Sequence, residues 1–282
     1  MKTFTYIIII LVPCFFLSCS KKDLNSKQNE NDLEFLPEDT GGMQKANNLG
    51  TTNAIFGHYI YTPSAYNESA NTPKYPLLIF LHGSGERGNS EINPDALKKV
   101  LVNGPPKLIE KGEWQPKHPM IVASPQLTSG NWNPDNIHSF ITYLITNYNI
   151  NTERIYLTGL SLGGFGSFNY ISSYGFDSYA AAIVPIAGGG NTNSGDKFTT
   201  TPVWAFHGDQ DNIVSHSQSI NMINAINEAD PEIKAKITLY PGVSHNSWSR
   251  TYNSSGMGDE SPNYDTFNMT IYDWMFMYKK GE

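Results

Sequence analysis

The chain has 282 residues, and 16% of them are charged, below the roughly 25% that is usual for soluble domains. The formal net charge is -7, and no cluster of Lys and Arg in the body of the chain offsets it, so the composition argues against a nucleic-acid partner. The length is sufficient for one large domain with a buried core, and the low charge suits a protein that works outside the cytoplasm.

The N-terminal segment has the features of an export signal. Lys2 precedes an apolar run over residues 6–17, which is too short for the roughly twenty residues that a membrane-spanning helix needs. The run ends in Phe-Leu-Ser-Cys at 16–19, which resembles a bacterial lipobox and implies that Cys19 carries a lipid. An ordinary signal peptide, and hence a secreted or periplasmic protein, is the alternative.

The polar stretch that follows has little apolar periodicity and is expected to be a flexible tether without a fold. The sequence therefore predicts three parts: a lipoprotein signal peptide over 1–19, a tether over 20–53 and a folded domain over 54–282. The lipid predicted on Cys19 is the only contact with a membrane that the sequence predicts.

Apolar runs of strand length alternate with amphipathic stretches of helical length along the folded domain. Strands are expected over 55–61, 77–81, 120–123, 154–158, 181–186, 202–206 and 236–240. Helices are expected over 136–148, 163–173, 217–229 and 266–278. This alternation predicts an α/β fold with a mostly parallel central sheet and helices on both faces, in which ligands bind at the carboxyl ends of the strands.

A G-x-S-x-G pattern lies between one such strand and helix. Ser161 stands at its centre, and glycines at 159, 163 and 164 permit a turn sharp enough to present the hydroxyl above the sheet edge. The pattern predicts a nucleophile, although a plain strand-to-helix connection has the same composition.

Two further residues follow their own strands in the order expected of a hydrolase. Asp211 follows the strand at 202–206 and is predicted to orient a histidine; Asp209 is the competing acid, and a turn-forming role is the alternative for either. His245 follows the strand at 236–240 and is predicted to act as the general base for Ser161. In this hypothesis Asp211 fixes the tautomer of His245 and stabilises its imidazolium.

An attacked carbonyl also needs N–H donors for its oxyanion. Leu162, directly after the nucleophile, offers one, and the glycine-rich loop after residue 81 is expected to offer a second from Ser84 or Gly83. Glu86 and Arg87 of that loop are expected to pair with each other and hold its shape.

The four motifs together resemble the α/β-hydrolase superfamily: HGSGERGN at 82–89, RIYLTGLSLGGFG at 154–166, PVWAFHGDQD at 202–211 and YPGVSHNSW at 240–248. Within it they resemble secreted esterases related to prolyl oligopeptidases, dienelactone hydrolases, polyhydroxybutyrate depolymerases and feruloyl or acetylxylan esterases. The resemblance implies a catalytic domain of the α/β-hydrolase fold, with Ser161, Asp211 and His245 as its triad. The chain has no room for the propeller domain of the oligopeptidases.

Two tryptophans near the motifs are candidates for a substrate pocket, with core packing as the alternative. Trp132 precedes a predicted helix, and Trp248 follows His245. The histidines show neither the spacing nor the thiolate partners of a zinc site, and no nucleotide-binding motif is present, so we expect no metal and no cofactor.

The leading hypothesis is a lipid-anchored serine carboxylesterase that acts on an ester, such as an acetyl or feruloyl group on a polysaccharide. A serine peptidase or polyester depolymerase would share the chemistry. A surface lipoprotein that binds carbohydrate without catalysis is the alternative of another class. The sequence leaves the acyl group, the alcohol and the oligomeric state open.

Overall fold

The computed structural model describes residues 33–69 and 73–281. Contacts within the chain define a unit of residues 1–35 and a unit of residues 36–282, and every helix and strand below belongs to the second. The predicted signal peptide, Cys19 and the first part of the predicted tether lie outside the described residues. The structure does not test these predictions.

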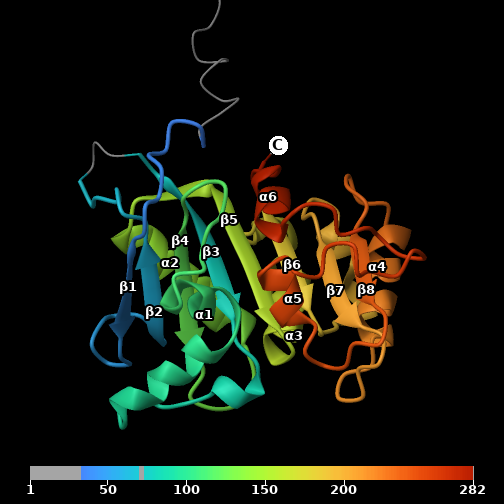
Figure 1. Cartoon of the computed structure of the whole chain (residues 1–282), viewed down its shortest axis with the longest axis horizontal. Coiled ribbons are helices and arrows are strands. Elements are labelled where there is room, and N and C mark those ends of the chain that lie inside the picture. Colours follow the sequence, from blue (N-terminus) through green and yellow to red (C-terminus); the bar gives the residue numbers. More distant parts are fainter. Residues whose placement is uncertain (1–32, 70–72, 282) are drawn as a thin grey trace, which may run out of the picture. The chain divides into compact units, whose positions relative to one another are not determined.

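The second unit is built on an eight-stranded sheet with the order β1-β2-β4-β3-β5-β6-β7-β8 (Figure 1). The strands are β1 (Met43–Asn47), β2 (Gly57–Thr62), β3 (Tyr75–Leu81), β4 (Ile121–Gln126), β5 (Ile150–Leu160), β6 (Ala182–Ile186), β7 (Trp204–Gly208) and β8 (Lys236–Tyr240). Only the pairs β1 with β2 and β2 with β4 are antiparallel within this sheet, and the other neighbours are parallel. The prediction of a mostly parallel sheet is confirmed.

Helices cover both faces of this sheet (Figure 1). One face carries α2 (Pro134–Asn147), α3 (Leu162–Tyr174) and α4 (Ser217–Glu228), and the other carries α1 (Gly104–Glu110), α5 (Trp248–Tyr252) and α6 (Ile271–Phe276). Short 3-10 segments complete the connections at Ser84–Glu86, Pro94–Val102, Gly175–Asp177 and Thr192–Phe198.

The central strands explain the continuous apolar runs of the sequence. Every residue of β3 is buried, because helices pack on both of its faces. The amphipathic pattern of α2 likewise turns Ile137, Phe140 and Leu144 inward, and Asn133 begins the helix by accepting hydrogen bonds from the first free amides with its side chain.

The register of the sheet places the loops that matter for function beside one another. Leu81, the last residue of β3, pairs with Gly159 near the end of β5, and Leu160 pairs with Ile186 at the end of β6. Because parallel strands end at the same edge, the loops after β3, β5 and β6 are neighbours there.

The expectation of an unfolded tether is wrong for residues 43–47, which form β1. Their side chains alternate too weakly to indicate a strand, with only Asn47 buried. The strand exists because its backbone pairs with β2 over its whole length, from Met43 opposite Thr62 to Asn47 opposite His58. The folded unit therefore begins before the predicted boundary at residue 54.

The last predicted helix is also shorter than expected, since α6 occupies only Ile271–Phe276. The preceding segment instead runs along the edge of β8, where the amides of Ser261 and Asp265 donate to carbonyls of that strand. Thr270 then starts the helix by accepting the amide hydrogen of Asp273 at 3.0 Å. Phe267, at the start of the predicted helix, is buried against aromatic side chains of β7, so packing on the sheet has overridden the helical spacing at this end.

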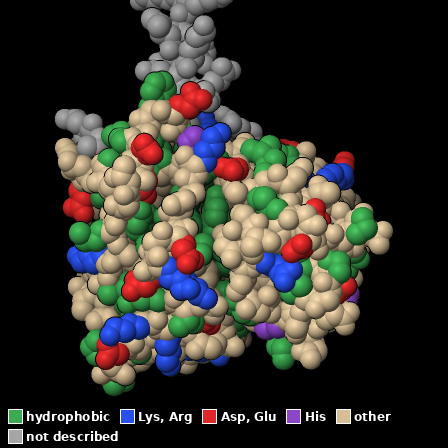
Figure 2. Space-filling model, viewed as in Figure 1, with side chains coloured by type: hydrophobic (Ala, Val, Ile, Leu, Met, Phe, Trp, Pro, Cys, Tyr) green, Lys and Arg blue, Asp and Glu red, His purple; other side chains and the backbone are tan. Residues whose placement is uncertain are grey.

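On the face that Figure 2 presents, acidic and basic side chains are interspersed among polar and apolar ones. This face therefore carries no extended field of one sign. Within the described residues, none of the helices combines the length and the apolar character needed to cross a bilayer.

Candidate active site

Ser161 occupies a sharp turn between β5 and α3. Its backbone has φ 51° and ψ -115°, a conformation that non-glycine residues rarely adopt. A side chain at Gly163 would collide with the backbone carbonyl of Leu81, and a Cβ on Gly164 would lie 2.6 Å from the carbonyl oxygen of Ile186. Glycine is therefore required on the helical side of the turn, because β3, β5 and β6 approach its backbone so closely.

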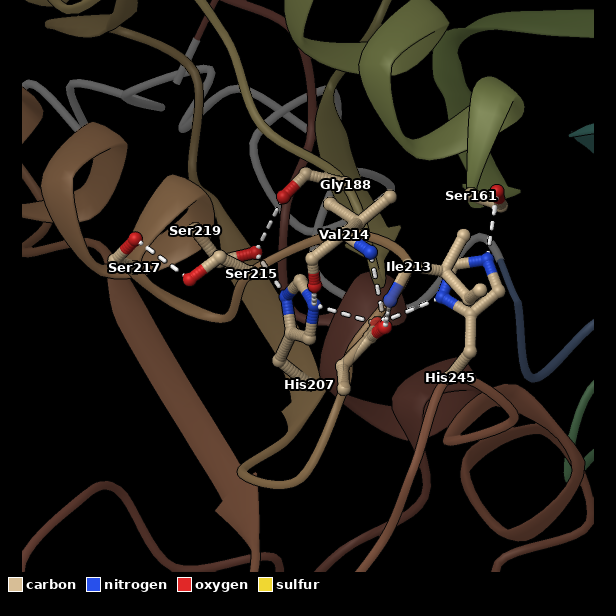
Figure 3. Close-up of polar contacts among 10 residues, drawn as sticks. Ser161, Gly188, His207, Ile213, Val214, Ser215, Ser217, Ser219 and His245 are labelled. Atoms are coloured by element: carbon tan, nitrogen blue, oxygen red, sulfur yellow. Dashed lines mark hydrogen bonds and ion pairs between the residues drawn. The ribbon is translucent and has the colours of Figure 1, made fainter.

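His245 lies in the loop after β8 and reaches across the sheet edge to the turn. Its Nε2 atom is 2.9 Å from the Oγ atom of Ser161 (Figure 3). The imidazole is 19% exposed, so it is open enough to meet a substrate. This is the geometry that proton transfer from a serine to an imidazole requires.

Asp211 is the third residue of the hydrogen-bonded chain that starts at Ser161 and passes through His245. Its Oδ2 atom is 2.6 Å from His245 Nδ1, and its Oδ1 atom accepts the amide hydrogens of Ile213 and Val214, each at 2.9 Å. Burial alone would raise the pKa of this carboxyl, but the hydrogen bonds from His245 and from the two amides outweigh burial and lower the pKa. Asp211 is therefore ionised near neutral pH and keeps the Nδ1–H tautomer of His245.

The competing acid has a different place. Asp209 lies in the turn after β7, where its Oδ1 atom accepts the amide hydrogen of Gly242 at 2.7 Å. That contact ties the loop after β7 to the loop after β8. The structure thus brings Ser161, His245 and Asp211 together, and gives Asp209 the turn-forming role that the sequence left open.

The loop after β3 is held in place by His82 and Trp132. His82 Nε2 accepts the amide hydrogen of Leu127 at 2.9 Å, so the ring proton is on Nδ1, which donates to the carbonyl of Gly83 at 2.6 Å. The indole of Trp132 donates to the carbonyl of His82 at 3.0 Å. Burial lowers the pKa of His82 to about 4, which keeps this ring neutral and its tautomer fixed near neutral pH.

These contacts fix the two peptide planes that carry the predicted oxyanion donors. In a trans peptide the N–H points opposite to the C=O, so fixing the carbonyls of His82 and Gly83 also fixes the amides of Gly83 and Ser84. Leu162 is the first residue of α3, and its amide has no acceptor within the helix. Gly83, Ser84 and Leu162 remain predictions as donors to an oxyanion.

The predicted pairing of Glu86 with Arg87 is wrong, because their side chains have separate partners. Glu86 is 4% exposed and accepts a hydrogen bond from Asn103 at 2.5 Å. Arg87 donates instead to the carbonyl of Gly130 at 2.8 Å. Glu86 ends the 3-10 turn and Arg87 follows it, so the two side chains point in different directions and tie the loop to two other segments.

The two tryptophans have different environments. Trp132 is 3% exposed, and its ring packs edge-on against Phe56 and His82, with ring centroids 5.5 and 4.9 Å apart. This burial contradicts the predicted place in a substrate pocket and gives the residue a role in supporting the loop. Trp248 is half-buried, with its ring perpendicular to His245 at 5.1 Å, so its contact with substrate remains a prediction.

Asn103 was not identified from the sequence and connects two of these loops. Its amide group donates to Glu86, while its Oδ1 atom accepts the indole hydrogen of Trp248 at 3.0 Å. The residue follows the 3-10 segment Pro94–Val102, and its type gives no signal of this bridge. Among residues 33–69 and 73–281, no group of three or more His, Cys, Asp or Glu side chains is arranged to hold a metal ion.

Comparison with known proteins gives consistent matches. Residues 126–270 match the model of the dienelactone hydrolase family. A curated relative, probable acetylxylan esterase A of Aspergillus clavatus, is 24% identical over 251 residues, covering 86% of this chain and 71% of the relative.

Two solved structures illustrate the structural matches. A thermostable esterase is 25% identical with a TM-score of 0.60, and the match covers 86% of this chain but 64% of that chain, slightly under two thirds. A serine-to-alanine mutant of the feruloyl esterase module from Clostridium thermocellum, complexed with sinapinate, is 19% identical with a TM-score of 0.51, covering 81% and 89%. With the family match, these similarities confirm the predicted α/β-hydrolase fold.

Proposed function

The chain belongs to the dienelactone hydrolase family and is accordingly a hydrolase of esters, and we propose that it works as a serine carboxylesterase outside the cytoplasm. One observation carries the proposed mechanism: the unbroken line of hydrogen bonds from Ser161 Oγ through His245 to the buried Asp211. A module that only binds carbohydrate has no physical need for this line, which argues against the non-catalytic alternative.

In the proposed first half-reaction, Ser161 Oγ attacks the ester carbonyl while His245 Nε2 takes the hydroxyl proton. Asp211 stabilises the imidazolium that forms. The negative charge on the former carbonyl oxygen is met by the amide of Leu162 and by an amide of the loop after β3. When the tetrahedral intermediate collapses, His245 returns its proton to the leaving alcohol and the acyl group stays on Ser161.

In the second half-reaction a water molecule takes the place of the alcohol. His245 removes a proton from this water as it attacks the acyl-enzyme, and returns the proton to Ser161 Oγ when the acid is released. The neutral His82 holds the same peptide planes throughout both steps, because it does not titrate near neutral pH.

Acetyl esters of a polysaccharide are the substrate class we propose first. The curated relative with the printed name probable acetylxylan esterase A supports this choice. Feruloyl esters come second, on the weaker ground of shared fold with a feruloyl esterase module. A peptidase or polyester depolymerase remains an alternative of the same chemistry.

The proposed location rests on the N-terminal sequence. We propose that the chain is exported and anchored by a lipid on Cys19. Expression of the full chain and of Cys19→Ala in a bacterial host supplied with a labelled fatty acid tests this: the label should be incorporated into the full chain and not into the variant. A full chain that takes up no label would refute the anchor.

The function is tested by hydrolysis of p-nitrophenyl acetate and butyrate, methyl ferulate, acetylated xylan and an aminoacyl-anilide, each with the native protein and with Ser161→Ala. Ester turnover that disappears in Ser161→Ala is the expected result. Cleavage of the anilide alone would support the peptidase. A native protein that turns over no ester and resists labelling by a fluorophosphonate would refute a serine esterase.

A further inference from the structure

His207 is a buried histidine that the proposed mechanism does not use. It lies in β7, one residue before the strand ends, and its side chain is fully buried. Its Nε2 atom is 3.0 Å from Asp211 Oδ2, the same oxygen that faces His245 Nδ1 at 2.6 Å. Figure 3 shows His207 and His245 as the two imidazoles of one hydrogen-bonded network.

The surroundings of His207 determine where its proton resides. Nε2 also lies 3.0 Å from the carbonyl oxygen of Val214, so this nitrogen faces two acceptors and must carry hydrogen. Nδ1 lies 2.8 Å from Ser219 Oγ, whose hydroxyl donates to the carbonyl oxygen of Gly188 at 2.8 Å. The two acceptors therefore require a hydrogen on Nε2, and this N–H is aimed at Asp211.

We propose that His207 is a positioning residue for the reaction: its Nε2–H holds Asp211 Oδ2 on the line to His245 and limits how strongly that oxygen binds the imidazolium. This inference rests on the proposed serine esterase function. It adds a second imidazole, on the opposite side of the carboxylate, to the three residues that the mechanism uses.

The reasoning follows from the hydrogen-bond capacity of one carboxylate oxygen. An oxygen that accepts two N–H donors is less basic than one that accepts a single donor. Without His207, Asp211 Oδ2 would bind only His245 and would hold its imidazolium more tightly. Because turnover needs the neutral imidazole as base, the acid limb of the pH profile would then move to higher pH.

The titratable groups around His207 are few. Asp211 faces it from the loop after β7, His245 lies beyond that carboxylate in the loop after β8, and His216 acts on it from the segment before α4. Burial lowers the pKa of His207, and the acceptors Val214 and Asp211 oppose this only in part. Nε2 carries hydrogen in both the neutral and the protonated ring, so His207 donates to Asp211 over the pH range of the assay.

The test compares His207→Leu with His207→Gln, whose side-chain amide can supply an N–H near the position of Nε2. We expect His207→Leu to lower kcat/KM about tenfold or more, and to move its acid limb upward by roughly half to one pH unit. His207→Gln should restore both. His216→Gln, at a half-buried histidine nearby, is the matched control and should leave the limb in place.

The outcomes separate this inference from the proposed function. If Ser161→Ala abolishes ester turnover but the acid limb of His207→Leu stays where it is in the native protein, the esterase stands and the role of His207 is overturned, because a merely structural loss lowers the plateau alone. Thermal unfolding of each variant shows that it is folded.

A second measurement does not depend on turnover. In the native protein labelled with ¹⁵N-histidine, we expect a slowly exchanging downfield proton on His207 Nε2, which shifts upfield in Asp211→Asn as the charged acceptor is lost. A signal that is the same in both proteins would refute the contact whatever the substrate is.

Discussion

Replacing Asp211 by Asn tests the acid of the proposed triad most directly. The Asn carbonyl can keep the amide hydrogens of Ile213 and Val214, but its NH₂ group then points at His245 Nδ1, where the native carboxylate accepts at 2.6 Å. Two donors would face each other. The imidazole is therefore expected to move its hydrogen to Nε2, which faces Ser161 Oγ and can no longer accept the hydroxyl proton.

The magnitude follows from the charge that is lost. At an effective dielectric constant of about 20, opposite unit charges roughly 3 Å apart interact by about 5 kcal/mol. This attraction exists only when His245 is an imidazolium, so its loss raises the barrier and not the energy of the resting enzyme. Since about 1.4 kcal/mol corresponds to a factor of ten, we expect kcat/KM of Asp211→Asn to fall by three to four powers of ten.

Asp209→Asn is the matched control for this change. The acid at 209 accepts one amide hydrogen, from Gly242, and an Asn carbonyl can accept it equally well. We expect its kcat/KM to stay within about threefold of the native value. The assay is steady-state hydrolysis of p-nitrophenyl acetate near pH 8, with the folded fraction of each variant measured by thermal unfolding. Equal losses in the two variants, or a larger loss in Asp209→Asn, would refute the assignment of Asp211.

Three further predictions concern the turn, the loop after β3 and acid stability. Gly163→Ala should lower the free energy of unfolding by about 3 kcal/mol or more, because the added methyl group meets a backbone carbonyl at the end of β3. Gly85→Ala is the control, since its methyl group meets nothing within 4 Å and should leave the free energy of unfolding nearly unchanged. Similar midpoints of urea denaturation for the two variants would contradict this. Trp132→Phe removes the indole donor to the His82 carbonyl and should lower kcat about tenfold with KM little changed; an unchanged kcat would show that the loop is held without it. The pKa of Asp211 is lowered in the folded state, so its contribution to stability is present above its ordinary pKa of 3.8 and is lost as the pH falls through the folded value. Between about pH 6 and pH 3, the free energy of unfolding should therefore fall less in Asp211→Asn than in the native protein. Parallel curves of this free energy against pH would contradict the shift.

The alternation of strands and helices could be predicted because the buried strands are continuously apolar and α2 is strongly amphipathic. The candidate site could be predicted because each of its residues follows directly on a strand, at the edge where parallel strands end together. These patterns depend on neighbouring residues in the sequence, and the structure forms the strands and helices that they predict. The prediction for Ser161, His245 and Asp211 rested on the G-x-S-x-G pattern, on the order of the three residues along the chain, on this common edge and on the resemblance of the four motifs to a known superfamily.

What the sequence could not show depends on contacts between distant segments. β1 is a strand because β2 offers it a backbone partner, and the side chains of Met43–Asn47 carry little sign of it. Trp132 was a candidate for the pocket by its position near a motif, but packing turns its indole toward His82. His207 stands in the motif that supplied Asp211, yet its contact with that carboxylate depends on the fold of the intervening turn.

The backbone angles of Ser161 have an evolutionary consequence. A non-glycine residue held at φ 51° and ψ -115° costs about 1–3 kcal/mol, a sizeable share of the 5–15 kcal/mol by which a domain is usually stable. Glycine would relieve this cost at once. Selection for heat resistance alone would thus remove the nucleophile, and only selection for turnover retains it. In a lineage released from the need for ester hydrolysis, position 161 is where glycine would be expected to spread first.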